Sequence, residues 1–460
     1  ADYRDDGRRH VRMSIVEQHK GLAQEILAES RSQGAEQATL TLATATAFQV
    51  EVREANIESL KEAGSSGIHL VLSQDGRRSS LTSNDFRLDT LRTLIRDTLT
   101  ALPHMDRDEW YTLPEQELQG RAPGDLAFLD PEHEHIASDE KVEDTLRLEE
   151  LALVQDSRLR TEQSYYSDAI SHTVYADSNG FLEGVSKTIH SVGVSLVVED
   201  NDASGENSGR KQTDGWFSCA RFRNQLEPLE EIAKVASGRI LRKLGAVKPK
   251  SCEVPVVFSP EMARSFLGQL SSALLGENVF RQQSFLADKV GQAIANPQVQ
   301  LSDSPLLPGK LGSRSYDHEG VQSKPLSLIE DGVLCNLMLS TYAANKLGLR
   351  STGHSGGISN LVLQPGAYTG EELIESVEDG LYLTFLSGQG ANITTGDYSR
   401  GGQGIWIRNG KLAEPVSEFT IASTFLEMLG NLTMLGKEVD TRSAILTPMF
   451  RIERMAISGT

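Results

Sequence analysis

The apolar positions of the first hundred residues switch between helical and strand spacing. In residues 14–33 they recur every three or four positions, and Gly34 follows where a helix C-cap is expected. Residues 38–60 alternate between apolar and polar side chains, and Asp75-Gly76 is a preferred two-residue turn for a further hairpin. Residues 86–101 return to helical spacing. The pattern predicts a helix, a set of hairpin-connected strands and a second helix.

The following segment changes character before regular spacing returns. Near residues 103–135 the chain is rich in proline and acidic side chains, which predicts a long surface connection. A helix is predicted to begin at Ser138, strands occupy residues 158–200, and another helix lies near 226–244. The small polar residues of 201–214 predict a mobile loop.

The second half of the chain repeats the mixture of hairpins and helices. A strand at 254–258 precedes a helix with Ser259 as N-cap and Gly276 at its end. Hairpin turns are indicated at Asp331-Gly332 and Asn409-Gly410.

Strands joined by hairpins and interleaved with helices are typical of an α+β fold. We therefore predict two lobes with mostly antiparallel sheets and packed helices. The N-terminal α+β domain covers residues 14–245, and a glycine-rich α+β or β domain covers residues 250–460.

Composition narrows the classes of partner. The 460 residues include 45 Lys and Arg against 64 Asp and Glu, a net charge of −19, which argues against nucleic acid. No apolar run is long enough for a membrane span, and residues 1–20 lack the apolar core of a signal peptide. Residues 1–12 are left out of the fold prediction, with Met13 as a natural start. Three widely spaced cysteines favour a reducing, cytoplasmic location.

Two short motifs suggest catalysis but lack the context that it requires. Gly353-His354-Ser355-Gly356-Gly357 matches a nucleophile elbow, yet no histidine follows it to act as the base. A glycine-rich turn is the preferred interpretation. His133-Glu134-His135 could hold a metal, but its acidic, proline-flanked surroundings favour a solvated loop.

The most unusual stretch is Thr395–Trp406, because four polar or aromatic side chains stand there between glycines. In one interpretation Arg400 pairs with Asp397 or another acid inside a structural turn. In the other, the glycines allow a substrate or partner backbone to approach closely. The same reasoning applies to the glycine-rich motif at 353–357. The candidates for peptide or partner contact in the two segments are His354, Gly356, Gly357, Asp397, Tyr398, Ser399 and Arg400.

Four segments together resemble the TldD/PmbA family. They are ENVFRQQSFLADKVGQ (277–292), LSTYAANKLGLRSTGH (339–354), STGHSGGISN (351–360) and TGDYSRGGQGIWIRNGKLAEPVSEFTIA (395–422). The resemblance extends along essentially the whole chain after about residue 14 and implies a PmbA/TldD-like fold.

The resemblance also implies a division of labour between two subunits. The catalytic TldD branch carries HExxxH on the helix that corresponds to about 260–275, and its two histidines and a later cysteine hold zinc. This chain reads FLGQLSSALLGEN there, has no His between His190 and His318, and has no Cys after Cys335. It therefore resembles the PmbA (TldE) branch, for which no zinc ligand and no catalytic residue are expected in this chain.

For this branch the resemblance implies a cytoplasmic heterodimer with a TldD-like subunit, which supplies the zinc. Its substrates would be unfolded or modified peptides, including peptide antibiotic precursors and antitoxins. A homodimer is possible when the chain is alone.

Two alternatives stay open at this point. His318, Asp317, His354 and Asp397 could converge into the site of an autonomous hydrolase. Alternatively, the chain could be a homodimeric module that binds peptides without turnover.

Overall fold

The structure is a computed structural model that describes residues 14–200 and 210–460. Contacts divide the chain into two compact units. The first takes its described residues from Ala1–Thr46, Gly64–Glu109 and Ile170–Lys187, and the second from Ala47–Ala63, Trp110–Ala169 and Thr188–Thr460. None of the helices in the described ranges has the length and apolar character needed to cross a membrane.

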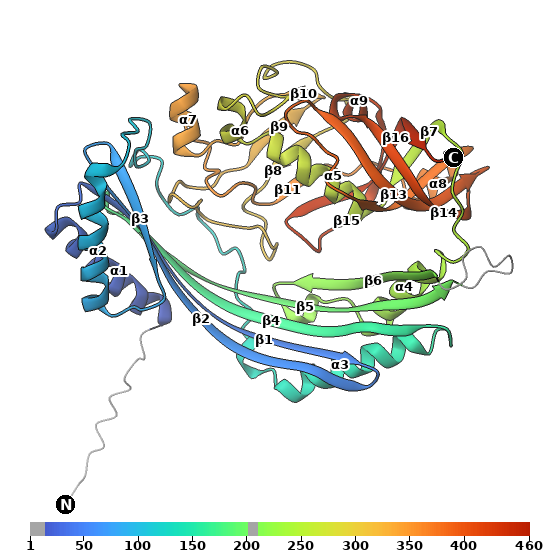
Figure 1. Cartoon of the computed structure of the whole chain (residues 1–460), viewed down its shortest axis with the longest axis horizontal. Coiled ribbons are helices and arrows are strands. Elements are labelled where there is room, and N and C mark those ends of the chain that lie inside the picture. The colour runs from blue at the N-terminus through green and yellow to red at the C-terminus, as the bar shows by residue number, and fades with distance from the viewer. Residues whose placement is uncertain (1–13, 201–209) are drawn as a thin grey trace, which may run out of the picture. The chain divides into compact units, whose positions relative to one another are not determined.

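A long sheet dominates the N-terminal half of the described chain (Figure 1). Its strand order is β3-β2-β1-β4-β5-β6, and the β2–β3 and β5–β6 pairs are antiparallel. The strands are β1 (Gln37–Arg53), β2 (Asn56–Gln74), β3 (Arg77–Ser83), β4 (Arg160–Asp177), β5 (Leu182–Asp200) and β6 (Arg210–Ala220). The predicted turn is confirmed, since Asp75 and Gly76 have φ angles of 53° and 69°.

Two helices pack on the sheet in the first unit. They are α1 (Ile15–Ser32), which Ser14 caps through its side chain, and α2 (Leu88–Ala101). Both were predicted, and Gly34 after α1 takes a left-handed φ of 109°. Their shared core contains Ile26 of α1 and Ile95 of α2, both fully buried.

Two further helices pack on the sheet in the second unit. They are α3 (Ser138–Leu153) and α4 (Leu229–Leu241), both predicted, and α4 packs against α3 and β6. The connection near 103–135 is confirmed as largely irregular, with two short turns, η1 (Leu102–His104) and η2 (His133–His135). A third such turn, η3 (Arg223–Gln225), precedes α4.

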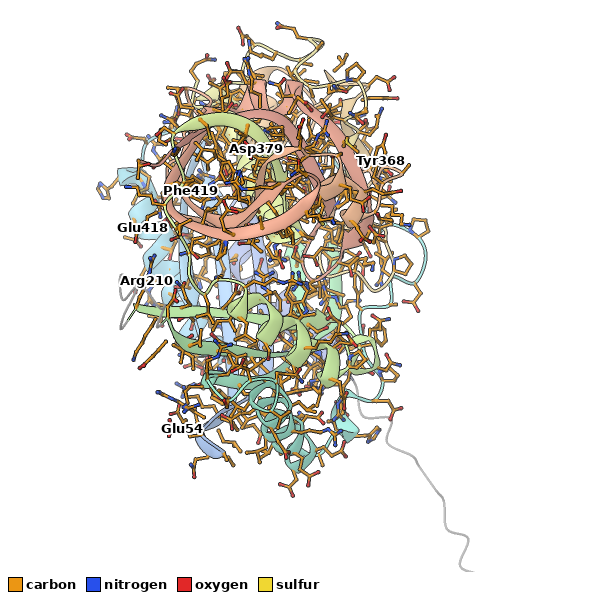
Figure 2. The ribbon with its side chains drawn as sticks, turned by 90° about the vertical axis from the view of Figure 1, so that its right-hand side faces the viewer. Glu54, Arg210, Tyr368, Asp379, Glu418 and Phe419 are labelled. Carbon is orange, nitrogen blue, oxygen red and sulfur yellow. The ribbon has the colours of Figure 1, made fainter. Side chains whose placement is uncertain are left out.

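The C-terminal half contains a second sheet whose pairings close a ring. β7 pairs in parallel with β12 and antiparallel with β16, and β16, β14, β13 and β12 then pair antiparallel in turn. Figure 2 shows this ring with Asp379 of β12 and Phe419 of β14 labelled. The strands are β7 (Cys252–Phe258), β8 (Leu301–Asp303), β9 (Leu326–Glu330), β10 (Val333–Leu334), β11 (Leu361–Leu363), β12 (Asp379–Ser387), β13 (Asp397–Arg408), β14 (Lys411–Thr424), β15 (Leu432–Asp440) and β16 (Ile445–Ser458).

The helices of this half are α5 (Pro260–Ala273), α6 (Gly276–Phe280), α7 (Thr341–Leu347), α8 (Gly370–Glu375) and α9 (Phe425–Gly430). Ser259 caps α5 and both C-terminal hairpin turns form, as predicted. The prediction of an α+β fold with mostly antiparallel sheets and packed helices is confirmed.

A cluster of aromatic rings anchors α5 to the ring of strands. Phe266 of α5 stacks on Phe425 at 5.3 Å between ring centroids and makes edge contacts with Phe258, Tyr398 and Phe450 at 6.4, 6.1 and 5.9 Å. All five side chains are buried. Apolar burial of this size is the main force that holds the helix in place.

Two local predictions are wrong. Residues 201–209 of the predicted loop 201–214 lie outside the described residues, but 210–214 belong to β6, because Arg210 pairs with Asp200 and continues the β5 ladder. In Figure 2 Arg210 lies near Glu418, its ion-pair partner at 3.1 Å. Gly276 does not end α5 but opens α6, where a Cβ atom would lie 2.6 Å from Leu339.

The aromatic cluster gives a stability prediction. Phe266→Ala should lower the free energy of unfolding by about 3–5 kcal/mol, because it leaves a cavity among four rings that cannot collapse. Urea unfolding followed by far-UV circular dichroism measures this. Leu426→Ala, at a side chain that is 36% exposed, is the matched control and should cost less than about 1 kcal/mol. Equal losses for the two variants would contradict the anchoring role.

Candidate functional site

The helix α5 has two faces with different roles. One face carries Phe266 and Leu270 into the core. The other carries Glu261, Ser265 and Gln269, which recur every four residues and so share one side of the helix. α5 is the helix that the family resemblance sets against the HExxxH helix of the catalytic branch, so its polar side chains show what the helix can hold.

Glu261 is held by two arginines. Its carboxylate forms ion pairs with Arg239 of α4 and Arg442, each at 3.1 Å. Arg442 also lies over the Trp216 ring, with 3.5 Å between its guanidinium carbon and the ring centroid. Glu261 therefore joins α5 to α4 and β6.

One of the predicted contact residues, Arg400, contacts the polar face of α5. Arg400 of β13 donates a hydrogen bond to the Ser265 hydroxyl at 2.8 Å and reaches the Leu386 carbonyl at 3.5 Å. The turn interpretation expected Arg400 to pair with an acid. In the described residues Arg400 instead contacts a neutral hydroxyl on α5. Arg400 stays half-buried.

The residues present on α5 do not fit a zinc ion. Protein zinc sites take three or four ligands from His nitrogen, Cys sulfur and carboxylate oxygen. The helix offers one carboxylate, already paired with two arginines, beside a hydroxyl and an amide. Across residues 14–200 and 210–460, no group of three or more His, Cys, Asp or Glu is arranged to hold a metal.

The glycine-rich segment turns its histidine inward. His354 is 3% exposed, and its Nε2 lies 3.1 Å from Oδ2 of Asp303. The same carboxylate accepts the backbone N–H of Ser359 at 2.8 Å and the hydroxyl of Ser359. Burial raises the pKa of Asp303, but the bonds from His354 and Ser359 outweigh it and the net shift is downward. This buried pair ties the segment to β8.

The fold itself requires glycine at positions 356 and 357. Both take left-handed φ angles, 88° and 82°. A Cβ atom on Gly356 would lie 2.4 Å from the His318 ring. The Gly357 carbonyl accepts a 2.7 Å hydrogen bond from Arg314, whose guanidinium is buried. Gly356 itself is exposed and Gly357 half-buried, so a partner or a peptide can still reach their backbone.

The remaining predicted residues lie at the start of β13. Asp397 is exposed and accepts a 2.6 Å hydrogen bond from the Thr395 hydroxyl, and Ser399 is exposed beside it. Tyr398 is 1% exposed within the aromatic cluster, where burial raises the pKa of its hydroxyl. Asp397 and Ser399 therefore face outward, while Tyr398 packs inside.

The residues of the alternative hydrolase site come together only in part. The backbone N–H of His318 bonds to Ser355, and Asp317 accepts the Ser355 N–H at 2.9 Å, so both lie beside His354. Asp397 is held separately, in the turn with Thr395. A nucleophile and a base need to meet within hydrogen-bond reach, and the buried His354 is already bound to Asp303.

The structure also reveals a half-buried acid with a raised pKa that the sequence pattern did not indicate. Glu319 accepts the Thr341 N–H at 2.9 Å, and burial, followed by the nearby Asp317 carboxylate, raises the pKa of Glu319 to about 7. No local spacing marks this residue, because its desolvation and its bond to Thr341 depend on the tertiary fold.

The prediction that residues 133–135 form a solvated loop is wrong for His133. The His133 side chain is only 10% exposed, lies 3.3 Å from Asp168 and packs beside His190 with 5.3 Å between the ring centroids. Asp168 in turn pairs with Lys141 at 2.5 Å. His135 stays exposed. The sequence could not show this, since Asp168 and His190 come from β4 and β5.

Comparison with known proteins places this geometry in a family. The PmbA/TldA metallopeptidase central domain matches residues 131–244, and the C-terminal domain of the same family matches 251–459. "Metalloprotease PmbA" of Escherichia coli O157:H7 is 30% identical over 434 residues, 94% of each chain. The PmbA homologue of Haemophilus influenzae is 28% identical and covers 92% of each chain.

Solved structures agree with this assignment. A protein of Bacteroides thetaiotaomicron, described as a modulator of DNA gyrase, superposes with a TM-score of 0.92 at 28% identity, over 97% of this chain and 100% of its own. TldE of Thermococcus kodakarensis has the same fold, with a TM-score of 0.84 at 20% identity over 95% of this chain and 100% of its own. The chain belongs to the PmbA/TldD family of metallopeptidases, as its motifs indicated.

The raised pKa of Glu319 gives a stability prediction with a definite sign. Its pKa rises from an ordinary 4.5 to about 7 on folding, so between these values the folded chain keeps a proton that the unfolded chain has released. The free energy of unfolding then falls as the pH rises through this window. Between pH 5 and pH 8, the free energy of unfolding of Glu319→Gln should rise by roughly 1–3 kcal/mol relative to that of the wild type.

Urea unfolding at a series of pH values measures this gain. The exposed Glu375→Gln is the control and should follow the wild-type profile. Parallel profiles for Glu319→Gln and wild type would contradict the assignment of the proton.

Proposed function

We propose that this chain is the PmbA/TldE-type subunit of a two-subunit zinc peptidase and that a TldD-like partner supplies the metal. The observation that carries the proposal is the set of side chains on α5, the helix that the resemblance sets against the HExxxH helix of the catalytic branch: it has no histidine and no cysteine. Its one carboxylate is paired with Arg239 and Arg442, and its other oxygen-bearing side chains are serine hydroxyls and one amide.

A zinc peptidase requires an open coordination position and a base beside it. A chain without these groups can still contribute to hydrolysis by enclosing the reaction and holding the substrate. The names of the relatives, metalloprotease PmbA and its homologue, support a role in peptide cleavage. The proposed substrates are unfolded or modified peptides, such as antibiotic precursors and antitoxins, and the proposed location is the cytoplasm.

The exposed parts of the glycine-rich segments are the proposed contact surface. Gly356, Asp397 and Ser399 are exposed, and Arg400 and Gly357 are half-buried. His354 and Tyr398 are buried and would act by holding these segments in shape. Glycine backbone without side chains allows an extended peptide or a partner loop to come close.

The distribution of zinc tests the proposal. Native mass spectrometry of this chain, co-expressed with an HExxxH-bearing relative from the same source, should show a heterodimer with one zinc ion. The chain alone should carry no zinc and cleave no peptide. One zinc per subunit in the lone chain would contradict the proposal and favour an autonomous hydrolase. Peptide binding without turnover and without any heterodimer would favour the homodimeric module.

The proposed contact surface has its own test. The double variant Asp397→Ala and Arg400→Ala should lower peptide cleavage by the assembled pair about tenfold or more, because it removes two charged groups from the proposed contact surface at the start of β13. Arg408→Ala, on the same strand and 54% exposed on its side chain, is the control and should leave cleavage unchanged. Unchanged assembly and cleavage in the double variant would contradict the assignment of this surface.

A further inference from the structure

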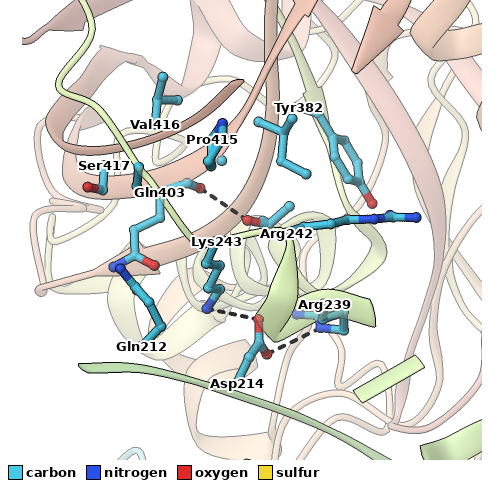
Figure 3. Close-up of a pocket in the computed structure, with 14 residues that line it drawn as sticks. Gln212, Asp214, Arg239, Arg242, Lys243, Tyr382, Gln403, Pro415, Val416 and Ser417 are labelled. Atoms are coloured by element: carbon cyan, nitrogen blue, oxygen red, sulfur yellow. Dashed lines mark hydrogen bonds and ion pairs between the residues drawn. The ribbon is translucent and has the colours of Figure 1, made fainter. Parts of the chain in front are cut away.

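A small pocket of about 60 Å³ lies within the second unit, between α4 and β6 on one side and β12, β13 and β14 on the other (Figure 3). Its cationic lining comes from the end of α4 and the residues just after it: Arg239, Arg242 and Lys243. Short apolar side chains form another part of its wall: Ala246, Ile405, Pro415 and Val416. This volume is several times that needed for one water molecule, so the pocket has room for one polar group together with a short side chain.

The charges that line the pocket do not balance. The three cations face one acid, Asp214, which lies 2.8 Å from Lys243 and 3.2 Å from Arg239. Arg239 is further paired with Glu261 at 3.1 Å. Arg239 and Lys243 therefore each have an acidic partner, and among the three cations of the lining only Arg242 has none within the described ranges.

Arg242 is the uncommitted cation. Within the described ranges its guanidinium makes no hydrogen bond and no ion pair, and the residue is exposed. In Figure 3 its side chain runs toward the hydroxyl end of Tyr382. Positive charge from Arg239 and Arg242 also acts on that hydroxyl.

Two neutral groups complete the lining. The Tyr382 hydroxyl and the Gln403 side-chain amide both belong to pocket residues and bond to no side chain or backbone group of the described chain. Burial, with the nearby Glu261 carboxylate, raises the pKa of Tyr382 to about 12. At neutral pH the hydroxyl therefore keeps its proton and is able to donate a hydrogen bond.

We propose that this pocket binds the terminal carboxylate of a peptide that ends in a short apolar residue. Arg242, Tyr382 and Gln403 would donate hydrogen bonds to the carboxylate, and Ile405 and Val416 would contact the apolar side chain. One uncommitted positive charge matches a monoanion better than a phosphate, which carries about −1.5 to −2 charges. The ammonium group of a free amino acid would be repelled by the same cations, which favours a blocked, peptide-like ligand.

This inference goes beyond the proposed subunit role and needs no partner chain, so the two can fail separately. Isothermal titration calorimetry of the full-length chain with N-acetyl-L-valine tests it directly. A Kd of about 1 mM is expected for so small a probe. N-acetyl-L-valine amide, free valine and inorganic phosphate should bind at least about tenfold more weakly. The amide has no negative charge, free valine carries an additional ammonium group, and phosphate carries more than one negative charge.

The variants separate the pocket from the general surface charge. Arg242→Gln should weaken N-acetyl-L-valine binding about tenfold or more, and Tyr382→Phe about threefold to tenfold, through lost hydrogen bonds to a charged group. Lys234→Gln removes the same charge from α4 at a side chain that is 71% exposed and outside the pocket lining, and should change the Kd less than twofold. Thermal melting of each variant checks that it is folded.

The contrary outcomes are equally definite. Absence of binding at about 20 mM probe would overturn the proposal. Equal binding of the acid and its amide would do the same, as would equal effects of Arg242→Gln and Lys234→Gln. Tighter binding of phosphate would replace the carboxylate site with a general oxyanion site, and tighter binding of free valine would exclude a peptide terminus.

Discussion

The packing of Phe266 against four other aromatic rings is the interaction on which the C-terminal half depends. It holds α5 against a ring of strands that pair back on themselves, so the helix has one possible orientation. With its apolar face committed to the core, the opposite face is presented to Arg400, Arg239 and Arg442. The chemistry that α5 can perform is thus limited to what this polar face carries.

The glycine-rich segment satisfies its polar groups inside the protein rather than in a catalytic centre. His354 is bound to Asp303, and Arg314 donates to backbone carbonyls at both ends of the turn. Buried polar groups that lack partners are costly, so these contacts keep the segment in a single conformation. What remains exposed is backbone at Gly356 and the side chains at the start of β13. Such a surface is suited to contact with another chain.

The two proposals concern different properties of the second compact unit. The subunit role follows from what the polar face of α5 lacks, and the carboxylate pocket follows from a cation that the fold leaves unpaired. The ion pairs of Arg239 connect the two places, because this residue contacts Glu261 of α5 and Asp214 of the pocket. A peptide held at its end beside α4 would lie close to α5, since Arg239 of α4 pairs with Glu261 of that helix.

The sequence by itself determined the elements with strong local signals. Ser14 and Ser259 mark helix starts, and Asp75-Gly76 and Asn409-Gly410 mark hairpins, because caps and tight turns depend on a few adjacent residues. Its motifs also identified the family and the missing HExxxH. Only the tertiary structure decided that His354, His133 and Glu319 contact residues of other segments, and that Arg242 makes no ion pair within the described ranges. Burial and charge balance arise from such contacts, and no spacing along the chain encodes them.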